Sequence, residues 1–279
     1  MQHLSESDIE EILSSIRSRT KDSNLGFFSK PFLVDYHGES LVVKQYLPIK
    51  DPQILNFILE NHSLYIQRLK EMGVLIPSTR MVQIPAGTKT QIIIIQEAFK
   101  SDELLRNKIQ SAGESELMTL CSKAYDQVIL YGLMQGSRGD IGYHPSLRNL
   151  AYRADKTYYY DTFPPMAMEQ QRLNDLIITM APFGRMLKPL INPKWINRVS
   201  DEYYYFDKIY EGVVGSCCRL RPELASLILE FSKDYLGESQ IDPFVKQAAQ
   251  KLLQKPPRLS GLWTGIRSLS GNEGKPNIS

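Results

Sequence analysis

Hydrophobic and polar residues recur with two different periods along the first hundred positions. Residues 5–18 carry isoleucine and leucine at three- and four-residue intervals after serines that can cap a helix, which predicts an amphipathic helix. The next segment has a period of two, because the runs PFLVDY and LVVKQYL flank a short polar loop at 37–40, and this predicts a hairpin. Residues 51–73 return to the helical period, with Asp51 as cap and Pro52 as first helical residue.

Two more predicted strands complete this half of the chain. They are STRMVQI and QIIIIQEAF, and a turn at 85–87 separates them. The second contains four consecutive isoleucines between glutamines, which is typical of a central strand that is buried on both faces. The first hundred residues therefore predict a small sheet with one helix inserted between its hairpins.

Beyond residue 100 the helical period dominates. A long periodic stretch covers 114–135, and several helices are expected over 167–255, separated by prolines. Between them, the sequence LAYRADKTYYYDTF predicts one short hairpin around 154–156. A sheet-rich half that leads into a helical half, with a hairpin at the junction, is typical of an α+β fold with a cleft between two lobes.

This pattern divides the chain into three parts. We expect an N-terminal lobe at 1–99, a helical C-terminal lobe at 100–255 that contains the hairpin segment 142–165, and a loosely ordered tail at 256–279. The tail is predicted from its composition, since two prolines are followed by Gly, Ser and Asn residues. The sequence contains no internal repeat.

The overall composition excludes several classes of function. Of 279 residues, 42% are hydrophobic and 23% are charged, and the net charge of +2 comes without any run of five like charges, so neither nucleic acid nor a membrane is an expected partner. Cys121, Cys217 and Cys218 have neither the pattern of a disulfide framework nor that of a metal site, which favours a reducing compartment. No apolar run reaches the roughly 20 residues of a membrane span, and the acidic N-terminus is unlike a signal peptide. We therefore expect a cytoplasmic protein.

Two residues of the first half could carry chemistry. Lys44 follows the apolar run at 41–43 in the second predicted strand, where an inward-facing ammonium group is costly unless it meets an anion or a carboxylate. The alternative is a lysine on an edge strand that faces water. Glu60, on the helix that follows, could pair with Lys44 or could be a solvated surface residue.

The strongest candidate site lies in residues 142–165. Asn149 precedes one strand of the predicted hairpin and Asp161 follows the other, so the hairpin brings an amide oxygen and a carboxylate to the same mouth. Hard oxygen ligands beside a cleft are what Mg²⁺ bound to the phosphates of a nucleotide requires. The alternative is that these two residues are a turn residue and a strand-end cap.

The order of these features resembles the protein kinase-like superfamily, and particularly its small-molecule branch of aminoglycoside and choline kinase type. Members have a Val-x-Lys strand, a helix with a glutamate, a hydrophobic strand with a hinge, a segment of the form His-Gly-Asp-x-x-x-x-Asn, a hairpin and a metal-binding aspartate. This sequence has, in the same order, Val42-Val43-Lys44, Glu60, the run IIIIQEAF, Asn149 and Asp161-Thr162-Phe163. The resemblance covers residues 25–165, and its motifs are degenerate.

The resemblance implies a two-lobed, protein kinase-like fold, with a small antiparallel-sheet N-lobe and a mostly helical C-lobe. It also implies ATP and Mg²⁺ as cofactors of phosphotransfer. Lys44 would hold the α- and β-phosphates of ATP, and Glu60 would orient Lys44. Asn149 and Asp161 would hold Mg²⁺, so that catalysis would consist mostly of positioning and charge neutralisation.

Other residues take their expected roles from the same resemblance. Gln96, Glu97 and Ala98 occupy the place of the hinge, where backbone groups would contact the adenine. Arg148 could contact a phosphate or an anionic substrate, or it could form a surface ion pair. We interpret the tyrosines at 158–160 as packing residues rather than as a surface on which a substrate stacks.

Two departures from the family pattern affect the chemistry. His144 stands where the usual catalytic aspartate would be, and it could accept a hydroxyl proton because histidine has a pKa of about 6.5. Alternatively, His144 is structural and the nearby Asp140 serves as the base. The glycine-rich nucleotide loop is also missing, since only Gly26 precedes the lysine hairpin, although some members of the small-molecule branch lack that loop too.

Three hypotheses follow. The first is an ATP- and Mg²⁺-dependent kinase that acts on a hydroxyl group of a small molecule, with a nucleotide and that acceptor as its partners. The second is a pseudokinase scaffold that binds a nucleotide or a partner without phosphotransfer. The third is a related fold redirected to another nucleotide-using reaction, such as adenylyl transfer. The missing aspartate favours the second hypothesis, whereas Lys44, Asn149 and Asp161 favour the first.

Overall fold

The computed structural model describes residues 4–16, 29–46, 48–180 and 193–257. The strands are β1 Ser29–Tyr36, β2 Glu39–Tyr46, β3 Thr79–Ala86, β4 Lys89–Glu97, β5 Leu150–Arg153 and β6 Lys156–Tyr159. The α-helices are α1 Glu6–Ile16, α2 Pro52–Glu71, α3 Leu105–Ser111, α4 Glu114–Gln135, α5 Gln170–Met180, α7 Pro193–Tyr204, α8 Phe206–Leu220, α9 Ala225–Glu238 and α10 Pro243–Leu252, with short 3₁₀ helices at Ser101–Glu103 and Pro222–Leu224.

The first four strands form one antiparallel sheet in the order β1-β2-β4-β3. A two-residue turn joins β1 to β2, because Tyr36 pairs with Glu39 and the intervening His37 and Gly38 have φ angles of 49° and 81°. Positive φ at both central positions is the geometry of a type I′ turn, whose twist matches that of a hairpin. In the strand order of the sheet, β2, which carries Lys44, lies between β1 and β4 and not at an edge.

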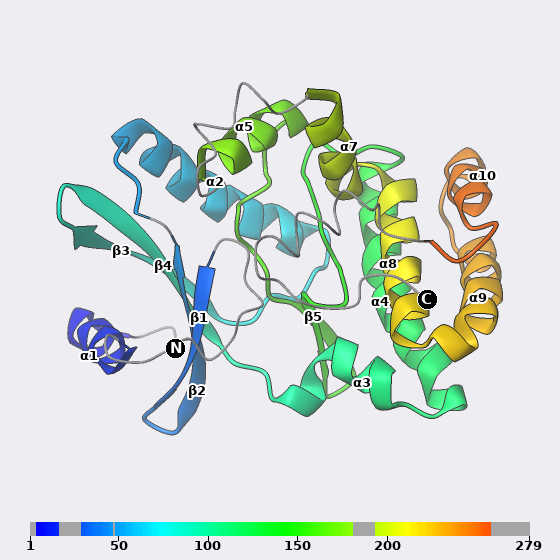
Figure 1. Cartoon of the computed structure of the whole chain (residues 1–279), viewed down its shortest axis with the longest axis horizontal. Coiled ribbons are helices and arrows are strands. Elements are labelled where there is room, and N and C mark those ends of the chain that lie inside the picture. The colour runs from blue at the N-terminus through cyan, green and yellow to red at the C-terminus, as the bar shows by residue number, and fades with distance from the viewer. Residues whose placement is uncertain (1–3, 17–28, 47, 181–192, 258–279) are drawn as a thin grey trace.

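The isoleucine run of β4 is buried on both faces, as predicted. Ile92 and Ile94 belong to the larger core together with residues of α2, whereas Ile93 and Ile95 belong to a smaller core. Helix α1 closes that smaller core with four buried residues, Ile9, Ile12, Leu13 and Ile16. The sheet is thus covered by α1 on one face and by α2 on the other (Figure 1).

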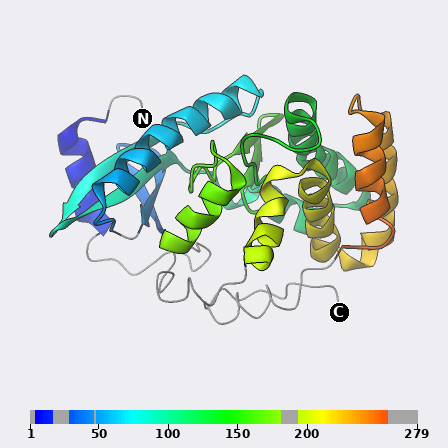
Figure 2. The ribbon, with the colours of Figure 1, turned by 90° about the horizontal axis from the view of Figure 1, so that it is seen from above.

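The second lobe is built around α4. This helix packs against α8 and α9, while α10 packs on α8 at the end of the molecule far from the sheet (Figure 2). Helices α4 and α8 approach closely at Gly132, where a Cβ atom would lie 2.5 Å from the ring of Phe206. No larger residue fits there without a shift of the neighbouring side chains.

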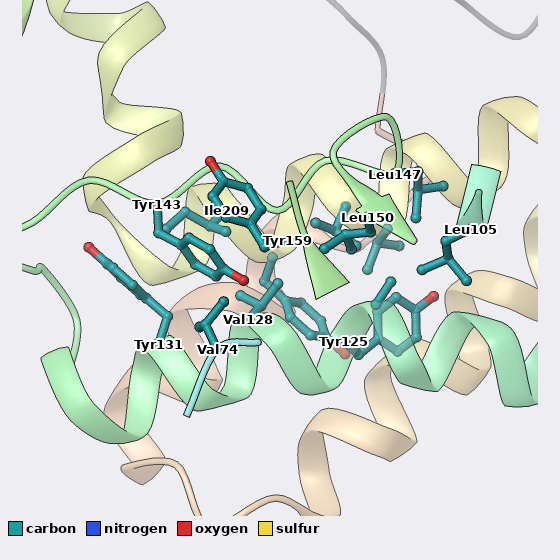
Figure 3. Packing of buried hydrophobic residues seen from close by; sticks show 14 of the residues in the cluster. Val74, Leu105, Tyr125, Val128, Tyr131, Tyr143, Leu147, Leu150, Tyr159 and Ile209 are labelled. Atoms are coloured by element: carbon teal, nitrogen blue, oxygen red, sulfur yellow. The ribbon is translucent and has the colours of Figure 1, made fainter. Parts of the chain in front are cut away.

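Buried tyrosines fix the β5–β6 hairpin on this lobe (Figure 3). The ring of Tyr131 on α4 stacks on Tyr143 with centroids 6.0 Å apart, and Tyr143 meets the edge of Tyr159 at 5.0 Å. Leu150 and Tyr159 are cross-strand partners, and both are fully buried. The hairpin therefore presents one face to the core of the helical lobe, in agreement with the packing role predicted for these tyrosines.

The hairpin also touches the chain segments that connect the two lobes. The backbone nitrogen of Tyr159 donates to the carbonyl of Leu75, 2.8 Å away, in the segment between α2 and β3. Leu104, after β4, forms an isolated bridge with Ala151. These contacts place the mouth of the hairpin at the junction of the sheet and the helices (Figure 1).

The predicted fold class is confirmed: α+β, with a small antiparallel sheet in the N-terminal lobe and a mostly helical C-terminal lobe. Helix α2 begins at the predicted cap, since the side chain of Asp51 accepts a hydrogen bond from the backbone nitrogen of Gln53. Gly26 and the predicted tail from residue 258 onward lie outside the described residues. Among the helices of the described ranges, none is both long and apolar enough to cross a membrane.

Candidate functional site

The hairpin brings the two predicted metal ligands to the same mouth. Beyond the Leu150–Tyr159 pair, the backbone nitrogen of Tyr160 donates to the carbonyl of Asn149, 3.1 Å away. Asp161 is the next residue along the chain, so it leaves the hairpin beside Asn149. The buried side chains of Leu150 and Tyr159 anchor this end of the hairpin in the core (Figure 3).

The side chain of Asn149 has a defined orientation. Its Nδ2 atom donates to the carbonyl of His144, 3.0 Å away, and its backbone nitrogen donates to the carbonyl of Ser146, 2.8 Å away. These bonds tie the ends of the loop 144–149 together. The amide nitrogen is a hydrogen-bond donor and does not bind cations, so Oδ1 is the atom of this side chain that can serve as a ligand to a cation.

Lys44 reaches the same mouth from the opposite lobe. Only 9% of this residue is exposed, and its Nζ atom donates to the carbonyl of Tyr160, 2.9 Å away. The Asp161 carboxylate lies 3.7 Å from the same ammonium group. The prediction that a buried strand lysine must meet a carboxylate is confirmed, and the alternative of a water-facing edge lysine is wrong, because β2 is an inner strand.

The ion pair is held at an electrostatic cost. Burial lowers the pKa of Lys44 and raises the pKa of Asp161, and the attraction between the two charges opposes both shifts. The two sides differ in access, since 11% of the Lys44 side chain and 38% of the Asp161 side chain are exposed. Charged groups whose pKa values are shifted by burial and by a charged partner are typical of functional positions. Of the two groups, the half-buried carboxylate is the one that an incoming cation can reach.

Helix α2 faces this mouth with polar residues other than the predicted Glu60. In the described part of the chain, the carboxylate that pairs with Lys44 belongs to Asp161, and no ion pair joins Lys44 to Glu60. The buried face of α2 instead carries Asn61 and His62, the next two residues along the helix. Successive residues of a helix point in different directions, so Glu60 lies on another face. Glu60 itself is exposed.

The predicted hinge lies inside the sheet. Gln96 is 2% exposed, and its Nε2 atom donates to Oγ1 of Thr79. The backbone nitrogen of Glu97 donates to the carbonyl of Ser78, and that of Ala98 donates to the carbonyl of Ser40. The backbone amides of Glu97 and Ala98 are thus already engaged, and the contact of this segment with adenine stays a prediction. A nucleobase at this position would instead meet carbonyl groups or residues beyond Ala98.

An aromatic wall follows directly after β4. The ring of Phe99 lies 5.4 Å from that of Tyr158 and 5.8 Å from that of Tyr160, and the Lys44 ammonium lies 5.5 Å from the centre of the Tyr160 ring. The guanidinium of Arg153 lies over Phe99 and forms a 2.7 Å ion pair with Glu97. Half-buried rings therefore cover the surface between the end of β4 and Lys44.

The two candidate bases lie in different surroundings. The half-buried ring of His144 packs on Tyr203 with centroids 4.7 Å apart, and burial, followed by the charges of Glu202 and Asp161, raises the pKa of that tyrosine. Burial lowers the pKa of His144 to about 4, so its imidazole is neutral at pH 7. Asp140 is exposed at the start of the loop, where its backbone nitrogen bonds the side chain of Gln135. His144 is therefore the candidate that is linked to the Asp161 side of the loop.

Arg148 is tied to the site through its backbone. The hydroxyl of Tyr160 donates to the carbonyl of Arg148, so the ring of Tyr160 is held against the loop that ends at Asn149. Burial raises the pKa of this hydroxyl, and the guanidinium groups of Arg106 and Arg148 oppose that shift. Positive charge from α3 and from the loop therefore acts on the Tyr160 hydroxyl.

Sequence reasoning missed the residues that support the site. Asn61 and His62 are polar residues at core positions of α2, between Ile58 and Tyr65, and this interruption of the apolar stripe was the available signal. Tyr160 was interpreted only as packing, although its carbonyl accepts from Lys44. Thr162 gave no signal in the sequence, because a small polar residue after a strand is common in ordinary turns.

The donor set fits Mg²⁺ that is carried by a nucleotide. The described residues contain no group of three or more His, Cys, Asp or Glu side chains that could hold a metal. Mg²⁺ in phosphotransfer sites usually takes one or two protein carboxylates and completes its shell with phosphates and water. A carboxylate from Asp161 and an amide oxygen from Asn149, with the Lys44 ammonium beside them, match that requirement.

Comparisons with known proteins identify the family but not an activity. The chain belongs to DUF6206, described as a family of unknown function, whose model matches residues 9–274. No curated protein matches the chain. Among solved structures, it is similar to the effector kinase LegK7 of Legionella pneumophila, with 12% sequence identity and a TM-score of 0.37. That match covers 94% of this chain but only 66% of the kinase chain.

The Lys44–Asp161 pair can be tested by a double-mutant cycle. Lys44→Met leaves the carboxylate without its cation, and Asp161→Asn leaves a buried ammonium without its anion. We expect each single change to lower the free energy of unfolding by about 1–3 kcal/mol, and the double variant to lose about 1 kcal/mol less than the sum. Urea denaturation of the four proteins measures this coupling.

The exposed pair Arg68–Glu71 provides a matched control for that cycle. Its nitrogen–oxygen distance is also 3.7 Å, but about half of each side chain is exposed. The same cycle with Arg68→Met and Glu71→Gln should give a coupling below about 0.5 kcal/mol, because solvent screens the charges. Equal couplings in both cycles would mean that burial adds nothing to the Lys44–Asp161 interaction.

Proposed function

We propose that the chain is an ATP- and Mg²⁺-dependent phosphotransferase that acts on a hydroxyl group of a small molecule. The observation that carries this proposal is the convergence of Lys44, from the sheet, with Asp161 and Asn149, at the mouth of the hairpin. A buried cation beside an accessible carboxylate and an amide oxygen suits a metal–phosphate group. The small-molecule acceptor follows from the resemblance to the aminoglycoside and choline kinase type.

The proposed mechanism assigns one task to each residue. The ammonium of Lys44 turns from the carbonyl of Tyr160 to the α- and β-phosphates. Asp161 and Oδ1 of Asn149 would hold Mg²⁺, which would supply neutralisation of phosphate charge. The acceptor oxygen bonds to the γ-phosphorus as the bond from that phosphorus to the bridging oxygen of ADP breaks. The hydroxyl proton passes to the neutral imidazole of His144.

The same rings and loop residues support the binding of a nucleotide. The aromatic wall of Phe99, Tyr158 and Tyr160 offers apolar ring surface next to Lys44, on which a nucleobase could stack. Stacking would take the place of hydrogen bonds between the nucleobase and the backbone amides of Glu97 and Ala98, because those amides already donate to other backbone carbonyls. Arg148 lies in the loop that ends at Asn149, where its guanidinium could contact a phosphate or an anionic acceptor.

Three observations favour a second candidate, a nucleotide- or partner-binding scaffold without phosphotransfer. The usual catalytic aspartate is replaced by His144, and the amides expected at the hinge are occupied. In addition, two open depressions that the structure describes, of about 540 and 480 Å³, are not lined by Lys44 or Asp161. Nucleotide binding without turnover would distinguish this candidate from the enzyme.

The proposal predicts two separable effects on thermal stability. ATP at about 100 times its dissociation constant should add about 2.7 kcal/mol to the free energy of unfolding, and Mg²⁺ should increase the effect of ATP. Asn149→Ala is expected to remove most of the increment due to Mg²⁺, while Lys44→Met should weaken the response to ATP itself. Differential scanning fluorimetry with ATP and Mg²⁺, separately and together, measures both effects.

Ser63→Ala is a suitable control for those melts, because Ser63 is an exposed residue of α2 whose hydroxyl donates within its own helix, to the carbonyl of Leu59. It should respond to ATP and Mg²⁺ as the unaltered protein does. A chain that shows no shift with ATP, in the presence or absence of Mg²⁺, would contradict both the enzyme and the nucleotide-binding scaffold.

The base can be identified by combining the pH dependence of ATP turnover with substitutions. A histidine base is active when its imidazole is neutral, and burial lowers the pKa of His144 to about 4, so turnover at saturating Mg²⁺ should be lost as the pH falls toward 4, not near 6.5. His144→Gln is expected to lower kcat by about 10²–10⁴-fold. Asp140→Asn should cause a smaller loss, and the opposite order of the two losses would assign the base to Asp140.

A further inference from the structure

Helix α2 holds the chain segment that follows Asp161 through two buried polar contacts. The Nε2 atom of His62 lies 3.2 Å from Oγ1 of Thr162, and the Nδ2 atom of Asn61 donates to the carbonyl of Ala167 at 2.8 Å. His62 and Asn61 are each 6% exposed, and Thr162 is 1% exposed. These bonds cross between a helix of the sheet lobe and the segment that enters the helical lobe.

A purely structural contact would not require these residue types. Leucine or isoleucine at positions 61 and 62 would bury apolar area without leaving any polar group to satisfy. Oδ1 of Asn61 has no hydrogen-bond partner among the described residues, and such a buried acceptor costs about 1–3 kcal/mol. The two buried polar side chains therefore lower the stability of the fold, while their hydrogen bonds fix the orientation of the segment that they contact. This combination is typical of a positioning role.

The hydrogen bond of His62 acts on the residue that follows Asp161, the candidate metal ligand. Thr162 is bonded to Asp161 through the backbone, and Phe163 packs on the ring of Tyr46, with centroids 3.8 Å apart. Tyr46 is on β2, two residues beyond Lys44. The segment 161–163 is thus fixed on one side by α2 and on the other by the strand that carries Lys44.

We infer that His62 is a positioning residue of the metal site: by fixing Thr162, it holds the carboxylate of Asp161 in the direction in which it meets Mg²⁺. The inference rests on the proposed function, because it assumes a nucleotide–metal complex at Asp161. It assigns to a neutral histidine the coupling between helix and site that the resemblance assigned to Glu60. Burial lowers the pKa of His62 to about 4, so no charge is involved at neutral pH.

The test is a titration of Mg²⁺ at saturating ATP, followed by thermal shift, on a set of matched variants. His62→Leu removes the bond to Thr162, and Thr162→Val removes it from the other side at nearly constant shape. Either change should raise the apparent dissociation constant of Mg²⁺ by about 10–100-fold, as is usual for partners that orient a metal ligand. His62→Gln, whose amide nitrogen can take the place of Nε2, should restore affinity to within about threefold of the unaltered protein.

The response to ATP without Mg²⁺ separates positioning from loss of structure. It should stay within about twofold in Thr162→Val, since Lys44 is unchanged, and a positioning residue should affect only the Mg²⁺ increment. Glu60→Gln should raise the dissociation constant of Mg²⁺ less than His62→Leu does. If His62→Leu does not fold, Thr162→Val alone decides the outcome.

Two results would overturn the inference while leaving the proposed function intact: unchanged Mg²⁺ affinity in Thr162→Val, or a larger loss in Glu60→Gln than in Thr162→Val. The absence of any ATP or Mg²⁺ response in the unaltered chain would instead overturn the proposed function, and the inference with it.

Discussion

The ion pair between Lys44 and Asp161 is the interaction on which the rest of the arrangement depends. One charge sits on an inner strand of the sheet and the other at the exit of a hairpin anchored in the helical lobe, 3.7 Å apart. Because burial disfavours both charged forms, the pair needs accurate placement from each side. The sheet, helix α2 and the tyrosine core beneath the hairpin supply that placement.

The two lobes contribute rigidity in different ways. Lys44 is fixed because β2 lies between β1 and β4 in a sheet that is covered by α1 on one face and by α2 on the other. Asp161 is fixed because Leu150 and Tyr159 anchor the hairpin, and because Thr162 contacts His62. The accessible carboxylate and the oriented amide of Asn149 then remain as candidate oxygen ligands on a rigid support, which is what the proposed phosphate-bound cation requires.

The periodicity of the sequence was sufficient for the fold, because period, caps and turn residues are local properties. Asp51, Gly38 and the isoleucines of β4 each act within a few residues of their own position. The candidate site was recognised where it depends on local patterns: the apolar run that precedes Lys44, and the hairpin that brings Asn149 and Asp161 together. The His62–Thr162 bond joins residues a hundred positions apart, and the engagement of the Glu97 and Ala98 amides depends on strand pairing. Neither has a local signature, so only the tertiary structure could reveal them.

The central claim is that this junction binds a metal–nucleotide complex, and a crystal structure with Mg²⁺ and a non-hydrolysable ATP analogue tests it most directly. Our account predicts a metal ion coordinated by the Asp161 carboxylate and Oδ1 of Asn149, with the Lys44 ammonium moved from the Tyr160 carbonyl to a phosphate oxygen. An analogue bound elsewhere, or an analogue at the junction with the Lys44–Asp161 contact intact and no metal at Asp161, would contradict it.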